Sequence, residues 1–157
     1  MEKTDFPYQK EDSVLFGVTY RPIIDLEIKT KFGWIPVLAY ADSGVDITLL
    51  PRSFLYFLDV KFTEDEVKEI GGVGGGKVPV IVRKVELRIC DEIIGVKVAI
   101  GRIKDIPYLL GRKDVFDHFE ICFRNLNSAS IGEYVQPKFL IQIHHLLRNL
   151  GDHAMIL

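Results

Sequence analysis

Cysteine is scarce in this chain of 157 residues, which has only Cys90 and Cys122. The two thiols are far apart in the sequence, and there are only two of them. They therefore provide neither the spacing of a zinc site nor the framework of a disulfide-rich secreted domain. Isolated thiols of this kind favour a reducing, cytoplasmic setting, and we expect no metal ion.

Long apolar runs and an excess of charge of one sign are also missing. No apolar stretch approaches the roughly 20 residues that a membrane-spanning helix needs, and the polar start of the chain lacks the apolar segment of a signal peptide. Twenty basic side chains stand against 22 acidic ones, without a basic cluster. This balance provides no electrostatic footprint for nucleic acid or an anionic membrane, so we expect neither as a partner.

The chain does have a large apolar fraction, 48% of its residues, which suffices for one compact domain. Alternation of apolar and polar residues, clearest at Ile24, Leu26 and Ile28, is typical of half-buried strands. Strands are expected over residues 14–20, 23–30, 34–41, 78–90, 92–100 and 120–123. Short helices are expected over residues 52–57, just after Thr63, and over 113–119. Many short strands and little helix predict an all-β barrel or sandwich.

The two ends of the chain differ from its middle. The first 13 residues are polar and are expected to form a loose leader. Residues 125–132 have the composition of a linker, and residues 137–150 place apolar side chains at near-helical spacing, which predicts a C-terminal amphipathic helix. We therefore divide the chain into a leader (1–13), a domain (14–124) and a C-terminal extension (125–157), and expect the extension to be dispensable for the core fold.

A glycine-rich run lies near the middle of the chain, with five glycines between Glu69 and Val82. From Gly71 it reads G-x-x-x-x-G-K, close to a phosphate-binding loop. Such a loop requires a hydroxyl residue after its lysine and a helix that begins there. Here Lys77 is followed by Val78 and then by a strand-like segment, so both requirements fail. The run instead indicates a flexible tip between two strands, and nucleotide binding is kept only as a distant alternative.

An aspartate follows directly on the apolar segment W-I-P-V-L-A-Y-A. A carboxylate at the end of a buried strand lies beside a low-dielectric interior, which makes Asp42 a candidate for acid–base chemistry. Gly44 allows a sharp turn with room for a ligand, and the Ser43 hydroxyl can hydrogen-bond across that turn. No nucleophile-elbow sequence surrounds Ser43, so it is not expected to be a nucleophile. Asp-Ser-Gly is common in ordinary turns, and its meaning depends on the rest of the chain.

Three blocks in order carry a family resemblance. They are L-A-Y-A-D-S-G-V-D-I-T-L-L (38–50), I-G-G-V-G-G-G-K-V (70–78) and Y-L-L-G-R-K-D (108–114). Together, over residues 14–124, they resemble the retropepsin-type aspartic proteases, the single-domain class that includes retroviral proteases. The resemblance implies an all-β, closed acid-protease barrel with one or two short helices. It also implies an aspartic endopeptidase acting on a peptide or protein substrate, without metal or organic cofactor.

The resemblance further implies a homodimer, because the chain has a single Asp-Ser-Gly and the family's chemistry uses two aspartates. Asp42 would then be catalytic in each subunit, and Ser43 and Gly44 would form the active-site loop. The implied substrate-binding residues are Asp46, Gly71, Gly72, Val73, Pro107 and Leu109. The glycines of residues 70–78 would let that hairpin act as a flap that bends over a bound peptide. Arg112 would form a structural ion pair with Asp46. The chain departs from the family where Ser43 replaces the commoner threonine, where Val45 replaces alanine, and in its extension after residue 124.

Two other classes stay open beside the protease. A retropepsin-like fold without useful turnover would be a peptide-binding or dimerisation module, and the glycine run leaves the nucleotide-binding alternative. Three histidines of the extension, His144, His145 and His153, invite a metal site, but no cysteine or carboxylate cluster accompanies them. A solvated helix face is the preferred interpretation of these histidines.

Overall fold

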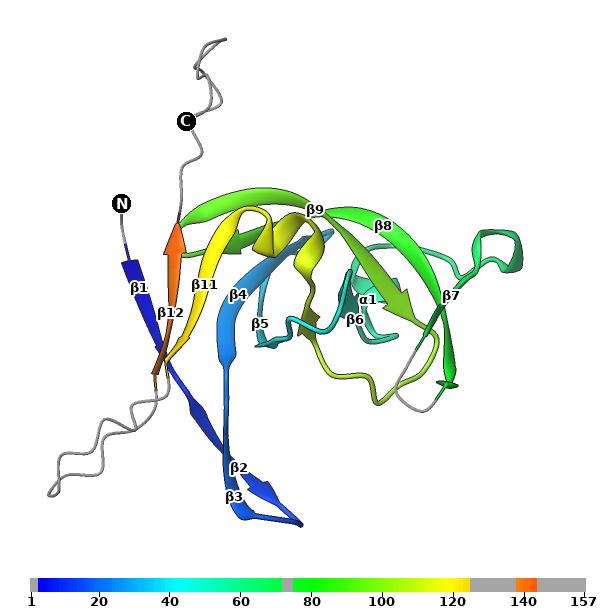
Figure 1. Ribbon diagram of the computed structural model, residues 1–157. Coiled ribbons are helices and arrows are strands. Elements are labelled where there is room, and N and C mark those ends of the chain that lie inside the picture. The colour runs from blue at the N-terminus through cyan, green and yellow to red at the C-terminus, as the bar shows by residue number, and fades with distance from the viewer. Residues whose placement is uncertain (1–2, 72–74, 125–137, 144–157) are drawn as a thin grey trace, which may run out of the picture.

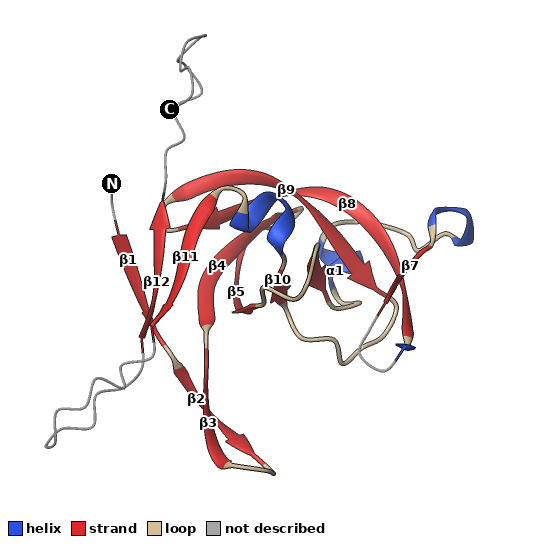
Figure 2. Ribbon diagram, in the orientation of Figure 1, coloured by secondary structure: helices blue, strands red, loops and turns tan. Residues whose placement is uncertain are grey.

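The computed structural model describes residues 3–71, 75–124 and 138–143 (Figure 1). Its strands are β1 (Lys3–Pro7), β2 (Gln9–Ser13), β3 (Gly17–Arg21), β4 (Ile23–Thr30), β5 (Gly33–Ala41), β6 (Thr48–Leu50), β7 (Lys68–Gly71), β8 (Lys77–Ile89), β9 (Glu92–Gly101), β10 (Leu109–Leu110), β11 (Phe119–Arg124) and β12 (Lys138–Ile143). Its short helices are α1 (Phe54–Phe57), the 3-10 turn η1 (Glu64–Glu66) and the irregular turn η3 (Arg112–Phe116). The predicted all-β class with short helices is confirmed (Figure 2).

The main sheet closes on itself. Its strand order is β4-β5-β10-β6-β9-β8-β7, and β4 pairs in addition with β8. That extra pairing, Glu27 with Arg88 and Ile28 with Leu87, joins the two sides of the sheet. Six strands thus form a ring, and β7 extends it beyond β8. The closed barrel expected from the sequence is confirmed.

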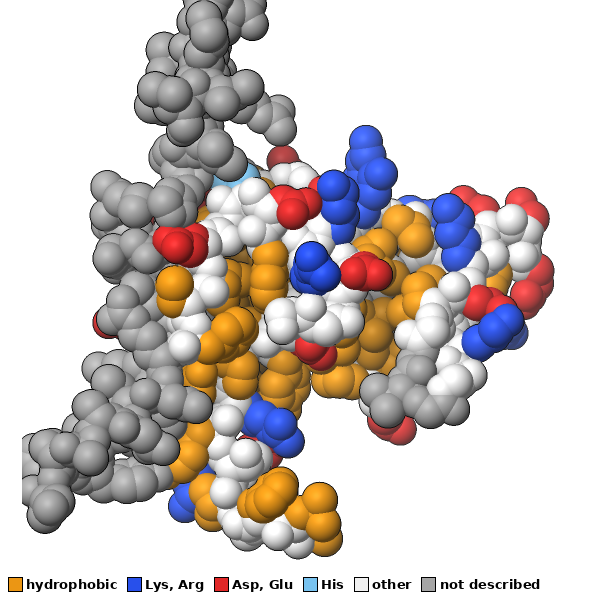
Figure 3. Space-filling model, viewed as in Figure 1, with side chains coloured by type: hydrophobic (Ala, Val, Ile, Leu, Met, Phe, Trp, Pro, Cys, Tyr) orange, Lys and Arg blue, Asp and Glu red, His pale blue; other side chains and the backbone are white. Residues whose placement is uncertain are grey.

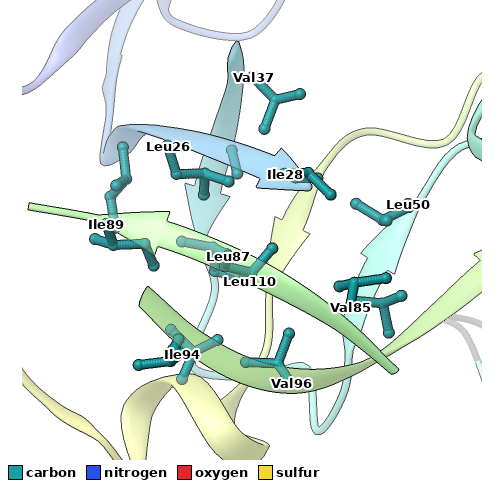
Figure 4. Packing of buried hydrophobic residues seen from close by; sticks show 14 of the residues in the cluster. Leu26, Ile28, Val37, Leu50, Val85, Leu87, Ile89, Ile94, Val96 and Leu110 are labelled. Atoms are coloured by element: carbon teal, nitrogen blue, oxygen red, sulfur yellow. The ribbon is translucent and has the colours of Figure 1, made fainter. Parts of the chain in front are cut away.

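The interior of the barrel is filled by the apolar side chains that alternate along its strands. Ile24, Leu26 and Ile28, whose spacing predicted a strand, are 0%, 4% and 1% exposed. Side chains from β5, β6, β8, β9 and β10 meet them in the same cluster; those labelled in Figure 4 are Val37, Leu50, Val85, Leu87, Ile89, Ile94, Val96 and Leu110. Burial of each such side chain stabilises the fold by about 1.5–3 kcal/mol.

A second sheet joins the two ends of the chain, in the order β1-β12-β11. The expected loose leader is therefore wrong for its described part, because residues 3–7 and 9–13 form β1 and β2. The helix expected over residues 137–150 is also wrong where the structure describes it, since residues 138–143 are strand β12. The rest of that expected helix lies outside the described residues.

Hydrogen-bond partners on both sides explain why this segment is a strand. β12 pairs along its length with β11, from Phe119 opposite Ile143 to Arg124 opposite Lys138, and β1 pairs with its other edge. A short apolar segment fits either period, and tertiary pairing decides between them. The division into leader, domain and extension stays a prediction, although this sheet crosses both proposed boundaries.

A two-stranded hairpin of β2 and β3 projects from the barrel (Figure 1). Its strands pair from Gln9 opposite Arg21 to Ser13 opposite Gly17. The strand expected over residues 14–20 therefore begins three residues later, because Val14–Phe16 form the turn of the hairpin. Gly17 leaves that turn with a φ of +71°, a left-handed conformation that glycine adopts without strain.

None of the helices that the structure describes is long and apolar enough to cross a bilayer.

Candidate active site

Asp42 stands at the rim of the barrel, on the first residue after β5. Ala41, the last residue of that strand, is 6% exposed, whereas the Asp42 side chain is half-buried. The pairing of β5 with β10 extends one residue beyond the end of β5, because the Asp42 N–H donates to the Leu110 carbonyl at 3.2 Å. The carboxylate is thus carried from the packed interior to the surface by a strand whose position is fixed on both sides.

The turn after β5 folds back onto this carboxylate. The Gly44 N–H donates to Asp42 Oδ1 at 2.8 Å, and the Val45 N–H donates to the Asp42 carbonyl at 3.3 Å. A Cβ atom on residue 44 would lie only 3.2 Å from that carboxylate oxygen. Glycine therefore allows the backbone to approach the carboxylate closely enough to orient it.

The segment after β10 braces the far side of the loop. Strand β10 lies between β5, to which it is parallel, and β6, to which it is antiparallel. Beyond β10, the N–H of Arg112 donates to the Val45 carbonyl and that of Lys113 to the Asp46 carbonyl, each at 2.8 Å. Main-chain bonds thus hold the loop over residues 42–47 at several points.

Gly111 brings the two segments into contact. Its N–H donates to the hydroxyl oxygen of Thr48, a side chain that is 2% exposed, at 3.2 Å. A Cβ atom at residue 111 would lie 2.4 Å from the carbonyl carbon of Ile47 and 2.6 Å from the Thr48 nitrogen. Only glycine fits this contact, which accounts for the glycine in the block Y-L-L-G-R-K-D.

The ion pair expected between Asp46 and Arg112 is not found. Among the residues that the structure describes, no salt bridge links their side chains, and both residues are exposed. The main-chain bond from Arg112 to Val45 joins the same two segments instead. In the single chain, the backbone provides the bracing that the resemblance assigned to these side chains.

A pocket of about 460 Å³ opens beside Asp42. Its lining includes Pro107 and Leu109, which the resemblance assigned to substrate binding. The remaining lining residues are Glu11, Arg21, Pro22, Tyr40 and Ala41. Sequence reasoning missed the contribution of the N-terminal residues, because it treated the region before residue 14 as a loose leader.

A polar cluster fastens the β2–β3 hairpin to this pocket. The Tyr40 hydroxyl donates to Glu11 Oε1 at 2.8 Å, and Arg21 Nε donates to Glu11 Oε2 at 2.9 Å. These hydrogen bonds, that of Tyr40 first, lower the pKa of the Glu11 carboxyl below its ordinary value. The same bond to Glu11 raises the pKa of the Tyr40 phenol, and partial burial adds to the rise.

The glycine run forms part of a hairpin, as the sequence predicted. β7 and β8 pair antiparallel up to Gly71 opposite Lys77, and Lys77 Nζ lies 2.8 Å from Glu69 Oε2. Gly71 is exposed at the end of β7. Gly72 and Val73 lie outside the described residues, and a role of this hairpin in covering a peptide stays a prediction.

No group of three or more histidine, cysteine, aspartate or glutamate side chains within the described ranges is arranged to hold a metal ion. His118 Nε2 lies 2.9 Å from Glu92 Oε2, while the three histidines of the extension lie outside those ranges. A slightly larger hollow of about 510 Å³ lies against β4, β5 and the end of β8. Glu27 and Arg88, two of its charged side chains, neutralise each other across 2.6 Å, and Asp42 is not among its lining residues.

Comparisons with known proteins find a structural similarity but assign no family to the chain. No family model matches the chain, and no curated protein sequence is significantly similar to it. Among solved structures, the chain is similar to EIAV protease complexed with the inhibitor HBY-793, with 24% sequence identity and a TM-score of 0.47. The similarity covers 59% of this chain and 82% of that protease chain.

Proposed function

We propose that this protein is an aspartic endopeptidase that hydrolyses peptide bonds in extended peptide segments as a homodimer. The observation that carries the proposal is the setting of Asp42. Its carboxylate is oriented by the Gly44 N–H, is braced through the segment after β10, and faces a pocket. Asp42 and Gly44 lie in the first of the three ordered sequence blocks that resemble retropepsin-type proteases, and the bracing residues Gly111 to Lys113 lie in the third.

Peptide hydrolysis by this route needs two carboxylates that share one proton. The ionised carboxylate takes a proton from water, while the protonated one donates a hydrogen bond to the carbonyl that is attacked. Two carboxylates in contact share a single proton because two negative charges so close together repel each other. Since the chain contributes one such aspartate, the complete site requires Asp42 from two chains related by a two-fold axis.

The pocket beside Asp42 suits a peptide substrate. Pro22, Pro107 and Leu109 give it apolar walls, whereas Glu11 and Arg21 place charged groups at one side. Apolar walls with a few polar groups are typical of sites that bind side chains in a defined orientation. The exposed edge of β7 near Gly71 lies in the hairpin that the resemblance assigns to covering the substrate.

The test is substitution of the carboxylate without change of shape. Asp42→Asn should lower cleavage of a diverse peptide library by several orders of magnitude, and the dimer should persist because repulsion between the carboxylates is gone. Asp59→Asn is the matched control, because Asp59 is an exposed aspartate paired with Lys31 at 3.2 Å and does not line the Asp42 pocket. Near-normal cleavage by Asp42→Asn would refute the protease assignment.

The same assay separates the alternative of a peptide-binding module without turnover. That alternative predicts no cleavage by the wild type at any pH, together with binding of a statine-type peptide inhibitor. The protease predicts cleavage at acidic to mildly acidic pH, where the two carboxylates hold one proton, and a decline as the second carboxylate ionises. An increase in the melting temperature of the protein on addition of ATP would instead favour the nucleotide-binding alternative.

A further inference from the structure

The turn of the β2–β3 hairpin is apolar and fully exposed. Val14, Leu15 and Phe16 have relative exposures of 104%, 83% and 78%. Turn positions usually carry glycine, proline, asparagine, aspartate or serine, and a run of exposed apolar side chains is unfavourable unless it meets a partner. In Figure 3 apolar side chains gather at the free end of this projection, well away from the packed barrel. The exposed turn therefore calls for a partner surface.

Among the strands that the structure describes, none pairs with the hairpin from outside it. β2 and β3 form a separate two-stranded sheet in which each pairs only with the other. An isolated two-stranded hairpin is only marginally stable in water. Side-chain bonds tie this one to the barrel at Glu11, midway along β2, which binds Arg21 and the Tyr40 hydroxyl. Residues 14–18 beyond it are exposed.

The base of the hairpin lies at the Asp42 pocket. Glu11 and Arg21 line that pocket together with Asp42, and Figure 1 shows the hairpin leaving the barrel on the side where β5 ends. If two Asp42 carboxylates meet at a two-fold axis, both hairpin bases lie close to that axis. Strands of five residues span roughly 17 Å, a length sufficient for the tip of each hairpin to contact the second subunit.

We infer that the β2–β3 hairpin is a dimerisation arm whose apolar turn, Val14–Phe16, packs on a second copy of this chain. The inference rests on the proposed function, because it takes the position of the two-fold axis from the need for two Asp42 carboxylates. Stable interfaces bury about 800 Å² on each partner. An arm from each subunit would add its apolar turn to the contact surface.

The charges beside the turn favour a protein partner over a lipid surface. Residues 14–18 carry no charged side chain, and the strands behind them hold two acids and two bases: Lys10, Glu11, Asp12 and Arg21. Segments that insert into anionic membranes carry an excess of lysine and arginine around their apolar residues. The mixed charges of this hairpin lack that excess.

The dissociation constant of the dimer tests the inference. We expect Leu15→Ser combined with Phe16→Ser to raise it by at least about tenfold, as removal of a buried apolar anchor does at interfaces. Phe32→Ser is the matched control, because Phe32 is 58% exposed in the turn between β4 and β5, at the opposite end of β5 from Asp42. Sedimentation equilibrium over a concentration series should give the control a constant within about twofold of the wild type.

A cross-linking experiment makes the test independent of any loss of folding. A photoreactive phenylalanine analogue in place of Leu15 should yield a covalent dimer on illumination, and the same analogue in place of Phe32 should not. A wild-type dimer that gives no Leu15 cross-link, or whose dissociation constant is unchanged in the double variant, would overturn the inference. So would wild-type binding to phosphatidylserine vesicles that the double variant loses while its dimer constant stays unchanged.

The failure of this inference and of the proposed function are distinguishable. A dimer that depends on the hairpin but cleaves no peptide would uphold the arm and refute the protease. An active dimer that is indifferent to Leu15 and Phe16 would refute the arm alone. A chain that stays monomeric at all concentrations would refute both.

Discussion

At the scale of the residue, the candidate site depends on small or polar side chains that let two backbone segments touch. Gly44 brings its N–H to the Asp42 carboxylate, and Gly111 brings its N–H to the Thr48 hydroxyl. Neither glycine can be replaced by a larger residue without a close contact to the loop that carries Asp42. The position of the carboxylate is therefore sensitive to changes in residues that do not touch a substrate.

Thr48→Val tests this dependence because it keeps the shape of the side chain and removes the hydroxyl. The buried Gly111 N–H would lose its acceptor, which costs about 1–3 kcal/mol of the free energy of unfolding. Thr48→Ser retains the hydroxyl and is the control. Hydrogen exchange at the Gly111 amide should accelerate in the valine variant and stay slow in the serine variant. Equal exchange in both would show that the hydroxyl does not hold this segment.

At the scale of the element, the β2–β3 hairpin is held to the barrel by a contact that depends on pH. Glu11 has a pKa lowered mainly by the Tyr40 hydroxyl, so its contribution to stability is fully present above its ordinary pKa and is lost as pH falls through the lowered value. Tyr40 has a raised pKa. Its contribution is present below the ordinary value for tyrosine and is lost as pH rises through the raised one.

We therefore expect the hairpin to loosen at acidic pH. Protection of the β2 and β3 amides, corrected for intrinsic exchange rates, should fall in the wild type as the pH drops below the ordinary pKa of glutamate, because protonation of Glu11 weakens its bonds to Tyr40 and Arg21. In Glu11→Gln the protection of the same amides should be lower at pH 6 and should change little with pH. An equal decline in both proteins would show that Glu11 does not anchor the hairpin.

Strand β12 gives a second prediction at this scale, and it reverses the expectation that the extension is dispensable. A chain ending at Asn127 lacks the strand that joins β1 to β11, and exposed strand edges promote aggregation. We expect a lower melting temperature and a greater tendency to aggregate than for a chain ending at Ile143, which keeps β12. Identical thermal unfolding of the two truncated chains would contradict the importance of this sheet.

Much of the barrel could be predicted from sequence because its strands alternate between a buried and an exposed face. Ile24, Leu26 and Ile28 carry that signal, as do the long β8 and β9. The segment that became β12 has a short apolar pattern compatible with both periods, and its pairing with β1 depends on residues more than 130 positions away. The hairpin was missed because β2 is polar and buries little, so no periodic apolar signal marks it.

In the candidate site, too, residues in local sequence patterns could be predicted, whereas contacts between distant residues could not. Asp42, Gly44 and the glycine at position 111 belong to short local patterns, and local patterns are visible in a single sequence. The contact of Glu11 with Tyr40 joins residues 29 positions apart and has no local signature. The structure also shows that backbone bonds, rather than the expected ion pair of Asp46 with Arg112, join the two segments of the site.

At the scale of the whole molecule, the proposal depends on the incompleteness of a single chain. One subunit presents one Asp42 at the rim of a closed barrel, with a pocket beside it and an exposed arm next to that pocket. A pair of carboxylates sharing a proton exists only when two such rims meet. The fraction of dimer and the rate of peptide cleavage per chain should therefore rise together as the protein concentration increases.

Subunit mixing measures this requirement directly. Wild-type chains and Asp42→Asn chains are mixed at constant total concentration, allowed to exchange subunits, and assayed for peptide cleavage. If each site needs an Asp42 from both subunits, only wild-type pairs are active, and activity at an equal mixture should be about one quarter of the wild-type value. A linear decrease, with about one half of the activity retained at an equal mixture, would mean that each chain acts alone, and it would contradict the shared-aspartate account.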